Sequence, residues 1–258
     1  MLKNQFKRIF KHMRWIYLSP HFDDAVLSCG GLIWEQTHSG IPVEIWTVTA
    51  GNPPPGPISD LITRVHSEWQ TGTPEETVTL RRSEDKNAAR RVGATVRHLG
   101  IVDALYRRTP TGTLMYTNDV FDPIHPREAG IVEQAAQEIS RHLTQYDTLV
   151  CPLAIGGHVD HIITRRAAES LGRPLWYYAD IPYLLRHPTE LAPAITGLSE
   201  KTFFISAQGL AAWQESIAAH ASQISSLFAD EQDMRSQIKN YHLTNSGLTI
   251  WERETAPA

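Results

Sequence analysis

The chain has 258 residues, 41% of them hydrophobic, and a formal net charge of −4. This is typical of a globular protein with one large or two small domains, and a modest charge spread along the chain gives no indication of a nucleic-acid partner. Two cysteines exclude a disulfide framework, and no run approaches the ~18 apolar residues of a membrane span. We therefore expect a cytoplasmic protein without an integral membrane segment. Residues 1–13 are basic and mildly amphipathic but lack a signal-peptide core, which predicts a solvated leader helix.

Hydrophobic periodicity predicts alternating strands and helices along the chain. Short β-branched and aromatic runs predict strands at residues 14–18, 41–49, 95–100, 148–152, 176–178, 203–205 and 248–251. Helical spacing of apolar residues predicts helices at about 26–38, 75–92, 128–146, 161–171 and 208–228. Alternation up to about residue 180 predicts a Rossmann-like α/β fold, with a mostly parallel sheet and helices on both faces.

The chain shows no internal repeat and no linker composition, so residues 1–258 are interpreted as a single domain, in which a more irregular part, 173–258, completes the fold. Residues 51–75 follow the second predicted strand and begin with a proline-rich run, which predicts a long loop with a short helical turn. Long loops inside compact domains are often lids or binding loops. A surface excursion without a role is the alternative.

A polar cluster follows the first predicted strand, where His21, Asp23 and Asp24 precede a helix. Ligands of open α/β sheets bind outside the carboxyl ends of the strands. An imidazole and two carboxylates are costly to bury there unless they are paired or bind a cation. The cluster is therefore a candidate site, although an aspartate at this place is also a common helix N-cap.

A second cluster, His158, Asp160 and His161, follows the fourth predicted strand in the same way. His158 and His161 are three residues apart, as are His21 and Asp24, so each pair can share one face at a helix start. Catalytic zinc commonly has three nitrogen or oxygen ligands and an open position, and it lowers the pKa of bound water to ~7. A neighbouring carboxylate can then take the proton. Two strand ends together predict one metal site, although each cluster alone could merely cap a helix.

These motifs resemble those of a known family. Ser19-Pro20-His21-Phe22-Asp23-Asp24 with Gly30-Gly31, and Gly156-Gly157-His158-Val159-Asp160-His161, are similar to the motifs of the zinc-dependent LmbE-like (PIG-L) de-N-acetylases. The segments 81–93, 98–103, 180–183 and 222–223 also look like family features, so the resemblance covers most of residues 14–240.

The resemblance implies a role for each matching residue. It implies that a zinc ion, with Fe²⁺ as the alternative metal, is bound by His21, Asp24 and His161. Asp23 would then be the general base that activates water. His158 would stabilise the tetrahedral intermediate or protonate the leaving amine, and Asp160 would orient His158.

Arg81 and Asp103 are candidates for holding substrate hydroxyls or positioning the site. For Arg81 an ion pair with Glu84 or Asp85 on its own helix is an equal alternative.

The sequence departs from the family pattern at three positions. Phe22 and Ala25 stand where the family usually has proline and glutamate, and Gly156 stands where mycothiol-type members have tyrosine. An oxyanion donor, if one is needed, must then come from elsewhere, and Tyr183 is a candidate. Because these departures and the proline-rich loop affect substrate contacts, no named member's substrate can be carried over.

We therefore expect a metal-dependent hydrolase that removes an acetyl group from an N-acetylated amino sugar or a glycoconjugate. Its partner would be this small molecule, and a homo-oligomer is compatible with the sequence. One alternative is an amidase for a non-sugar amide, such as a thiol conjugate or an antibiotic precursor. The other is a non-catalytic sugar- or nucleotide-binding module, although the glycines lack the Gly-x-Gly-x-x-Gly spacing of a dinucleotide site.

Overall fold

The computed structural model of the chain describes residues 13–121 and 123–253. The expected basic leader therefore lies outside the described residues, apart from Met13. The strands are β1 (Trp15–Ser19), β2 (Val43–Thr47), β3 (Thr95–His98), β4 (Thr148–Pro152), β5 (Leu175–Tyr178), β6 (Ser199–Phe203) and β7 (Leu248–Glu252). The main helices are α2 (Asp24–His38), α3 (Asp60–Glu68), α4 (Pro74–Arg91), α5 (Ile131–Ser140), α6 (Val159–Ser170), α9 (Ala207–Ala218), α10 (Ala221–Leu227) and α11 (Glu231–Asn245). No helix in these residues is both long enough and apolar enough to cross a membrane.

The described strands form one sheet in the order β3-β2-β1-β4-β5-β7-β6. Strands β3 to β5 in this order are parallel, and β7 and β6 are antiparallel additions at one edge, so the predicted mostly parallel sheet is confirmed. The strand order reverses between β1 and β4, which pair directly through Tyr17 and Val150. In an open α/β sheet this reversal leaves a crevice at the carboxyl ends of the two strands.

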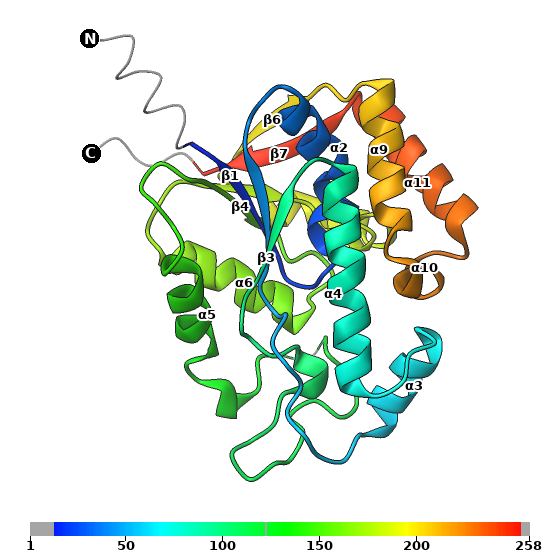
Figure 1. Cartoon of the computed structure of the whole chain (residues 1–258). Coiled ribbons are helices and arrows are strands. Elements are labelled where there is room, and N and C mark those ends of the chain that lie inside the picture. The colour runs from blue at the N-terminus through cyan, green and yellow to red at the C-terminus, as the bar shows by residue number, and fades with distance from the viewer. Residues whose placement is uncertain (1–12, 122, 254–258) are drawn as a thin grey trace.

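Helices cover both faces of the sheet (Figure 1). One face carries α2, α4, α9 and α11, and the other carries α5 and α6. Helix α2 packs closely on α9 because a Cβ at Gly30 would lie only 2.6 Å from Cδ1 of Trp213. The indole Nε1 of Trp213 donates to the carbonyl of Val26 at 2.8 Å, which fixes this contact.

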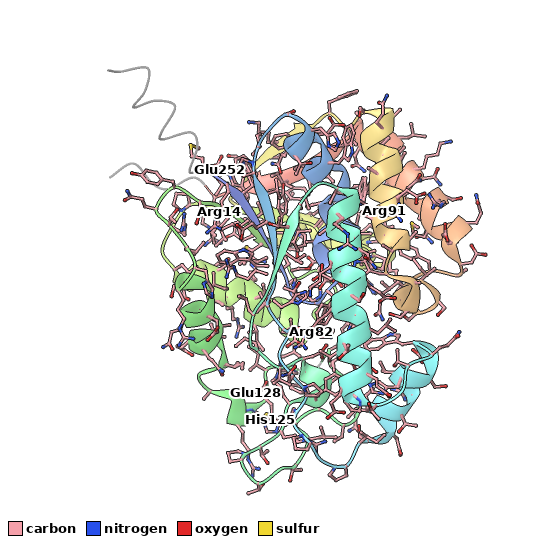
Figure 2. The ribbon with its side chains drawn as sticks, viewed as in Figure 1. Arg14, Arg82, Arg91, His125, Glu128 and Glu252 are labelled. Atoms are coloured by element: carbon pink, nitrogen blue, oxygen red, sulfur yellow. The ribbon has the colours of Figure 1, made fainter. Side chains whose placement is uncertain are left out.

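At the amino ends of the strands, Arg14, which directly precedes β1, forms ion pairs with residues of β2 and of the segment before β4 (Figure 2). Its Nε donates to Asp147 Oδ1 at 3.0 Å, beside the start of β4, and its Nη1 pairs with Glu44 on β2. This end of the sheet is therefore occupied by structural ion pairs, while the carboxyl end is left for the polar clusters.

The C-terminal part differs most from the prediction. The single helix expected at 208–228 is two helices, α9 and α10, separated by a turn at His220, and α11 was not predicted. Only Met234 and Ile238 of α11 are buried, so its apolar pattern is weak. Strand β6 covers Ser199–Phe203, whereas the prediction placed it at 203–205. It is an exposed edge strand with mostly polar residues, so hydrophobic periodicity does not mark its position. The helix expected at 128–146 is shorter, and α3 forms the helical turn expected within residues 51–75.

Candidate active site

The turn after β1 is fixed by its own short side chains. Ser19 Oγ donates to the carbonyl of His21 at 2.6 Å and accepts from the backbone N–H of Ala25 at 2.9 Å. Asp24 Oδ2 accepts from the backbone N–H of His21 at 2.7 Å. Asp23 occupies the N-cap position of α2 but makes no side-chain capping bond, so its carboxylate is available to the crevice.

The two turns bring four candidate donors together. Asp24 Oδ2 lies 3.2 Å from His21 Nδ1 and 3.3 Å from His161 Nε2. The ring of His158 lies edge-on to that of His21, with centroids 4.5 Å apart. His21, His158 and His161 each offer a nitrogen within 4.8 Å of the others, and all three side chains are buried. Residues that follow β1 and β4 and are far apart in the sequence therefore converge at the crevice.

Each histidine facing Asp24 is held from behind by a second carboxylate. His161 Nδ1 donates to Asp180 Oδ1 at 2.6 Å, and His21 Nε2 donates to Asp160 Oδ2 at 3.2 Å. His161 Nε2 is buried and has no hydrogen-bond partner. A buried imidazole with one nitrogen fixed by a carboxylate and the other facing a second carboxylate without a hydrogen bond is the arrangement of a metal-binding histidine. His21, Asp24 and His161 therefore fit a divalent cation.

A second group of possible donors, His21, Asp103 and Asp160, lies on the other side of the His21 ring. Its two carboxylates already face arginines: Arg81 Nη1 is 4.0 Å from Asp103, and Arg107 Nη1 pairs with Asp160. Their charge is matched within the protein, so the Asp24 side is the better place for a cation.

The buried carboxylates around His21 and His161 stabilise positive charge at this cluster. Burial lowers the pKa of His161, but Asp24 and Asp180 outweigh burial and raise that pKa to about 9. Burial likewise opposes the charged form of His21, and the Asp160 and Asp24 carboxylates overcome it and hold the pKa of His21 well above its usual value. The two histidines in turn keep the pKa of Asp24 well below its usual range despite its burial.

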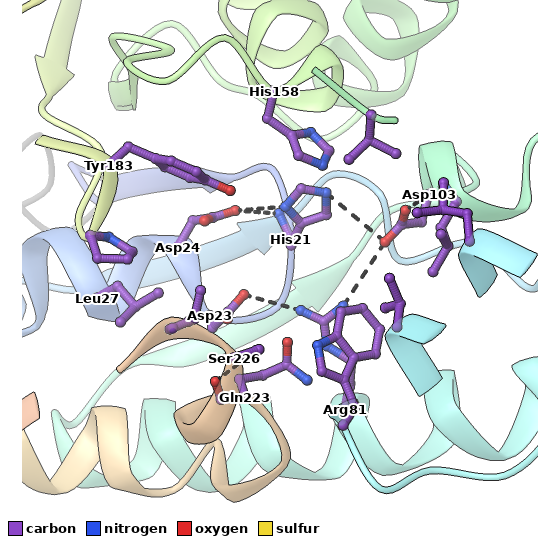
Figure 3. A pocket seen from close by; sticks show the side chains of 17 residues that line it. His21, Asp23, Asp24, Leu27, Arg81, Asp103, His158, Tyr183, Gln223 and Ser226 are labelled. Carbon is purple, nitrogen blue, oxygen red and sulfur yellow. Dashed lines mark hydrogen bonds and ion pairs between the residues drawn. The ribbon is translucent and has the colours of Figure 1, made fainter. Parts of the chain in front are cut away.

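His158 differs from the other two histidines. Burial, reinforced by the charge of His21, holds the pKa of His158 well below its usual value, so the ring is neutral. Its Nδ1 accepts from the backbone N–H of Asp160 at 3.1 Å, and the hydrogen of the neutral ring is therefore on Nε2. The ring lines the pocket and can donate a hydrogen bond there (Figure 3).

A cavity of about 130 Å³ lies over these groups (Figure 3). Its polar floor includes Asp23, Arg81 and Asp103. Apolar side chains of α3 and of Trp69 at its end, which belong to the proline-rich loop segment, form one wall, and residues of α10 form another. The residues of these two walls are Leu61, Val65, Trp69, Gln223, Ser226 and Leu227. The segment 51–75 thus contributes to the pocket.

Arg81 points into the site and not along its own helix. Its Nη2 donates to Asp23 Oδ1 at 3.2 Å, and its guanidinium lies over the ring of Trp69 at 4.6 Å and that of Phe22 at 5.3 Å. The alternative pairing within the helix does not occur. Glu84 instead accepts from Ser222, and Asp85 accepts from Thr47 Oγ1 and pairs with His98.

Asp160 does not hold the ring of His158 as expected. Its carboxylate is hydrogen-bonded to His21, Arg107 and the backbone N–H of Ala104, and His158 receives only the backbone N–H of Asp160. The reason is the position of His158 at the N-cap of α6, where its Nδ1 accepts the backbone N–H of Asp160.

Tyr183 lies beside Gly156. With a φ of +85° at Gly156, an added Cβ would lie 2.6 Å from Cδ1 of Tyr183, so the tyrosine ring fills the space that a side chain at 156 would need. The ring packs edge-on against His161, and Tyr183 lines the pocket next to Asp24 (Figure 3). Burial raises the pKa of Tyr183, which keeps the phenol protonated and able to donate.

Sequence reasoning gave no role to Asp180, Gln223 or Glu128. Asp180 follows β5 at the same edge of the sheet, so its position after a predicted strand was a usable signal. Gln223 belongs to segment 222–223, which the resemblance marks as a family feature without a role. Glu128 comes from a segment whose placement depends on tertiary packing, and no local pattern distinguishes it.

The chain is similar to known proteins in both sequence and fold. The family model for GlcNAc-PI de-N-acetylase (PIG-L) matches residues 16–171. The chain is 28% identical to a 2'-N-acetylparomamine deacetylase of Niallia circulans, over 98% of this chain and 93% of that protein. It is 31% identical to a 2'-N-acetylparomamine deacetylase of Streptomyces fradiae, over 66% of this chain and 57% of that protein.

Among solved structures, a zinc-inhibited form of the teicoplanin deacetylase Orf2 superposes with a TM-score of 0.78 at 25% identity, covering 93% of this chain and 97% of that one. The A40926 pseudoaglycone deacetylase Dbv21 superposes with a TM-score of 0.71 at 25% identity, covering 95% of this chain and 99% of that one. The likeness to both structures extends over nearly the whole chain, including the part beyond residue 171.

Proposed function

Because the chain belongs to the GlcNAc-PI de-N-acetylase (PIG-L) family, we propose that this enzyme is a zinc-dependent deacetylase that hydrolyses the acetamide of an N-acetylated amino sugar. The observation that carries the proposal is the buried Nε2 of His161, which makes no hydrogen bond and lies 3.3 Å from Asp24 Oδ2, while Asp180 fixes the other nitrogen of the ring. His21, Asp24 and His161 would hold the cation. Three nitrogen or oxygen ligands with room for water are the ligand set of a catalytic zinc.

The remaining groups would perform the proton transfers. The bound cation would polarise the acetamide carbonyl and lower the pKa of water to about 7. Asp23 would accept the proton of the attacking water, and Arg81, which donates to its Oδ1, would hold it in place. His158 would donate a hydrogen bond from Nε2 to the carbonyl oxygen as charge develops there. Asp23 would then pass the proton taken from water to the leaving amine, so the base ends in its original state. The Tyr183 hydroxyl would serve as a further donor to the same oxygen.

The substrate would be an amino sugar carried on an antibiotic-like scaffold. Relatives that match nearly the whole chain include a 2'-N-acetylparomamine deacetylase, a teicoplanin deacetylase and the A40926 pseudoaglycone deacetylase. The pocket combines a charged floor with the apolar side chains of Leu61, Val65 and Trp69, which suits a ring with hydroxyl edges and an apolar face. A non-sugar amide is the competing class, because only the acetamide must reach the floor.

Acetate release from a panel of amides tests the proposal. The panel would contain 2'-N-acetylparomamine, free N-acetylglucosamine, an N-acetylglucosaminyl glycopeptide and an N-acetyl amino acid, each with the zinc-loaded enzyme. We expect release from the sugars and not from the amino acid. Asp23→Asn should retain zinc and lose about 10²–10⁴-fold in kcat. Full activity of this variant would overturn the base assignment, and preferential cleavage of the amino acid would overturn the sugar class.

A further inference from the structure

We propose that Arg107, anchored by Glu128, is a positioning residue for the cation-binding histidine His21 and acts through Asp160. The inference rests on the proposed function only in taking His21 as a metal ligand. It concerns a chain of buried side chains that runs from the metal-binding turn after β1 to the irregular segment before α5.

The first link is Asp160, whose side chain is completely buried and uses both carboxylate oxygens. Its Oδ2 accepts from His21 Nε2 at 3.2 Å and from the backbone N–H of Ala104 at 2.9 Å. Its Oδ1 accepts from Arg107 Nη1. Because a carboxylate receives the hydrogen of Nε2, the Nδ1 lone pair of His21 is directed toward Asp24 and the cation.

The second link is Arg107, which is 5% exposed. Besides Asp160, its Nη1 donates to the carbonyl of Val102 at 3.0 Å, while its Nε and Nη2 donate to Glu128. The planar guanidinium therefore spans two buried carboxylates with a fixed geometry, which the ammonium of a lysine cannot reproduce. This fork determines the rotamer of Asp160 and, through it, the orientation of the His21 ring.

The third link is Glu128, which is 6% exposed (Figure 2). Its Oε2 accepts from the Tyr116 hydroxyl at 2.6 Å, and that hydroxyl in turn accepts from the backbone N–H of His125 at 2.9 Å. Glu128 is thus itself held from the side away from the cation. Every member of the chain is hydrogen-bonded, which is what a buried polar network needs in order to specify one geometry.

The neighbouring Arg108 provides a matched control. Its Nη1 and Nη2 donate to the carbonyls of Gly112 and Pro57, at 2.9 and 2.6 Å, and it pairs with no carboxylate among the described residues. Both arginines line a cavity of about 490 Å³ that also reaches Glu128. Free guanidinium can therefore approach the place that the Arg107 side chain would leave.

The test measures zinc affinity by competition with a chromogenic chelator, using the full chain. We expect Arg107→Ala to weaken zinc binding about 10- to 100-fold, guanidinium chloride to restore part of the loss, and Arg108→Ala to leave the affinity unchanged. Arg107→Lys should weaken binding by about 10-fold, because the charge remains while the fork is lost. The double variant Arg107→Ala/Asp160→Asn should bind zinc no more weakly than Asp160→Asn alone, because the two residues act in series.

Wild-type zinc affinity in Arg107→Lys, or fully additive losses in the double variant, would overturn the inference. If Arg107→Ala does not fold, Arg107→Lys and Glu128→Gln keep the test decisive, since both retain most of the side-chain volume. Failure of the wild-type protein to bind any divalent metal would instead refute the proposed function, and with it the premise that His21 is a ligand. Tight binding by wild type together with unchanged binding by Arg107→Lys would refute the positioning role alone.

Discussion

The turns after β1 and β4 have the same polar spacing but use it differently. The β1 turn places His21 before the helix and Asp24 at its first residue, and both face the same point. In the β4 turn, His161 faces that point from inside α6, while His158 caps the helix with its Nδ1 and remains neutral. Equal spacing in sequence therefore gives two candidate ligands at one turn, and one candidate ligand with one hydrogen-bond donor at the other.

The largest expected effect is the loss of metal on substitution of His161, and it distinguishes this candidate ligand from the hydrogen-bond donor His158 in the same turn. His161→Ala should abolish bound zinc and lower kcat by about 10³-fold or more, because the several kcal/mol supplied by the metal are lost. Metal content by elemental analysis and acetate release check this. The partner substitution Asp180→Asn should show the same defect in milder form, about 10- to 100-fold in metal affinity. Stoichiometric zinc in His161→Ala would show that the ligand set has been misassigned.

The next effect concerns His158. His158→Ala should keep zinc while kcat falls about 10²–10³-fold, because one donor to the developing oxyanion is removed. Its ring lies as close to His21 as a ligand would, so the sequence spacing alone does not decide its role. Loss of zinc in this variant would make His158 a ligand and would erase the proposed division between the two turns.

A smaller catalytic effect is expected at Tyr183, in the segment that follows β5. Tyr183→Phe should lower kcat by about 10²-fold without changing zinc content, if the hydroxyl stabilises the same oxyanion. Tyr178→Phe is the matched control, because the Tyr178 hydroxyl donates to the carbonyl of Leu18 at 2.9 Å and lies in the core. That control should lose about 1 kcal/mol of stability with kcat unaffected. Equal kcat in Tyr183→Phe and wild type would remove Tyr183 from the mechanism.

The smallest effect is structural and compares two adjacent glycines before α6. Gly156→Ala should cost about 1–3 kcal/mol in the free energy of unfolding and displace Tyr183, because the residue has positive φ and its Cβ would clash with the tyrosine ring. Gly157→Ala also has positive φ but meets open space, so it should cost only the backbone strain, about 1–2 kcal/mol. Urea denaturation measures both. Equal costs would mean that Tyr183 does not depend on Gly156 for its place.

Sequence reasoning located the site because its polar residues stand between a strand and a helix, where local patterns are informative. His21, Asp23 and Asp24 needed only the β1 run before them and the α2 pattern after them. The parallel α/β pattern and the resemblance placed both turns at strand ends of one sheet, and the structure adds that β1 pairs directly with β4.

The contacts of charged side chains could not be predicted in the same way. Arg81 lies on a helix with several charges, and only packing shows that it points at Asp23 and not at Glu84. The resemblance implied that Asp160 orients His158. Its carboxylate instead contacts His21 and Arg107, and Arg107 comes from a segment without regular periodicity. Helix α11 and strand β6 were missed or misplaced because each buries little apolar surface, and hydrophobic periodicity detects burial.

The most direct test of the account is acetate release by metal-stripped enzyme, measured before and after addition of one equivalent of Zn²⁺, or of Fe²⁺ under anaerobic conditions. An N-acetylated amino sugar that the untreated enzyme cleaves serves as substrate, and His161→Ala is assayed in parallel. The account predicts that stripped wild type is inactive, that one equivalent of metal restores it, and that His161→Ala stays inactive. Full activity of the stripped wild type would contradict the central claim that a divalent cation at His21, Asp24 and His161 is required for the reaction.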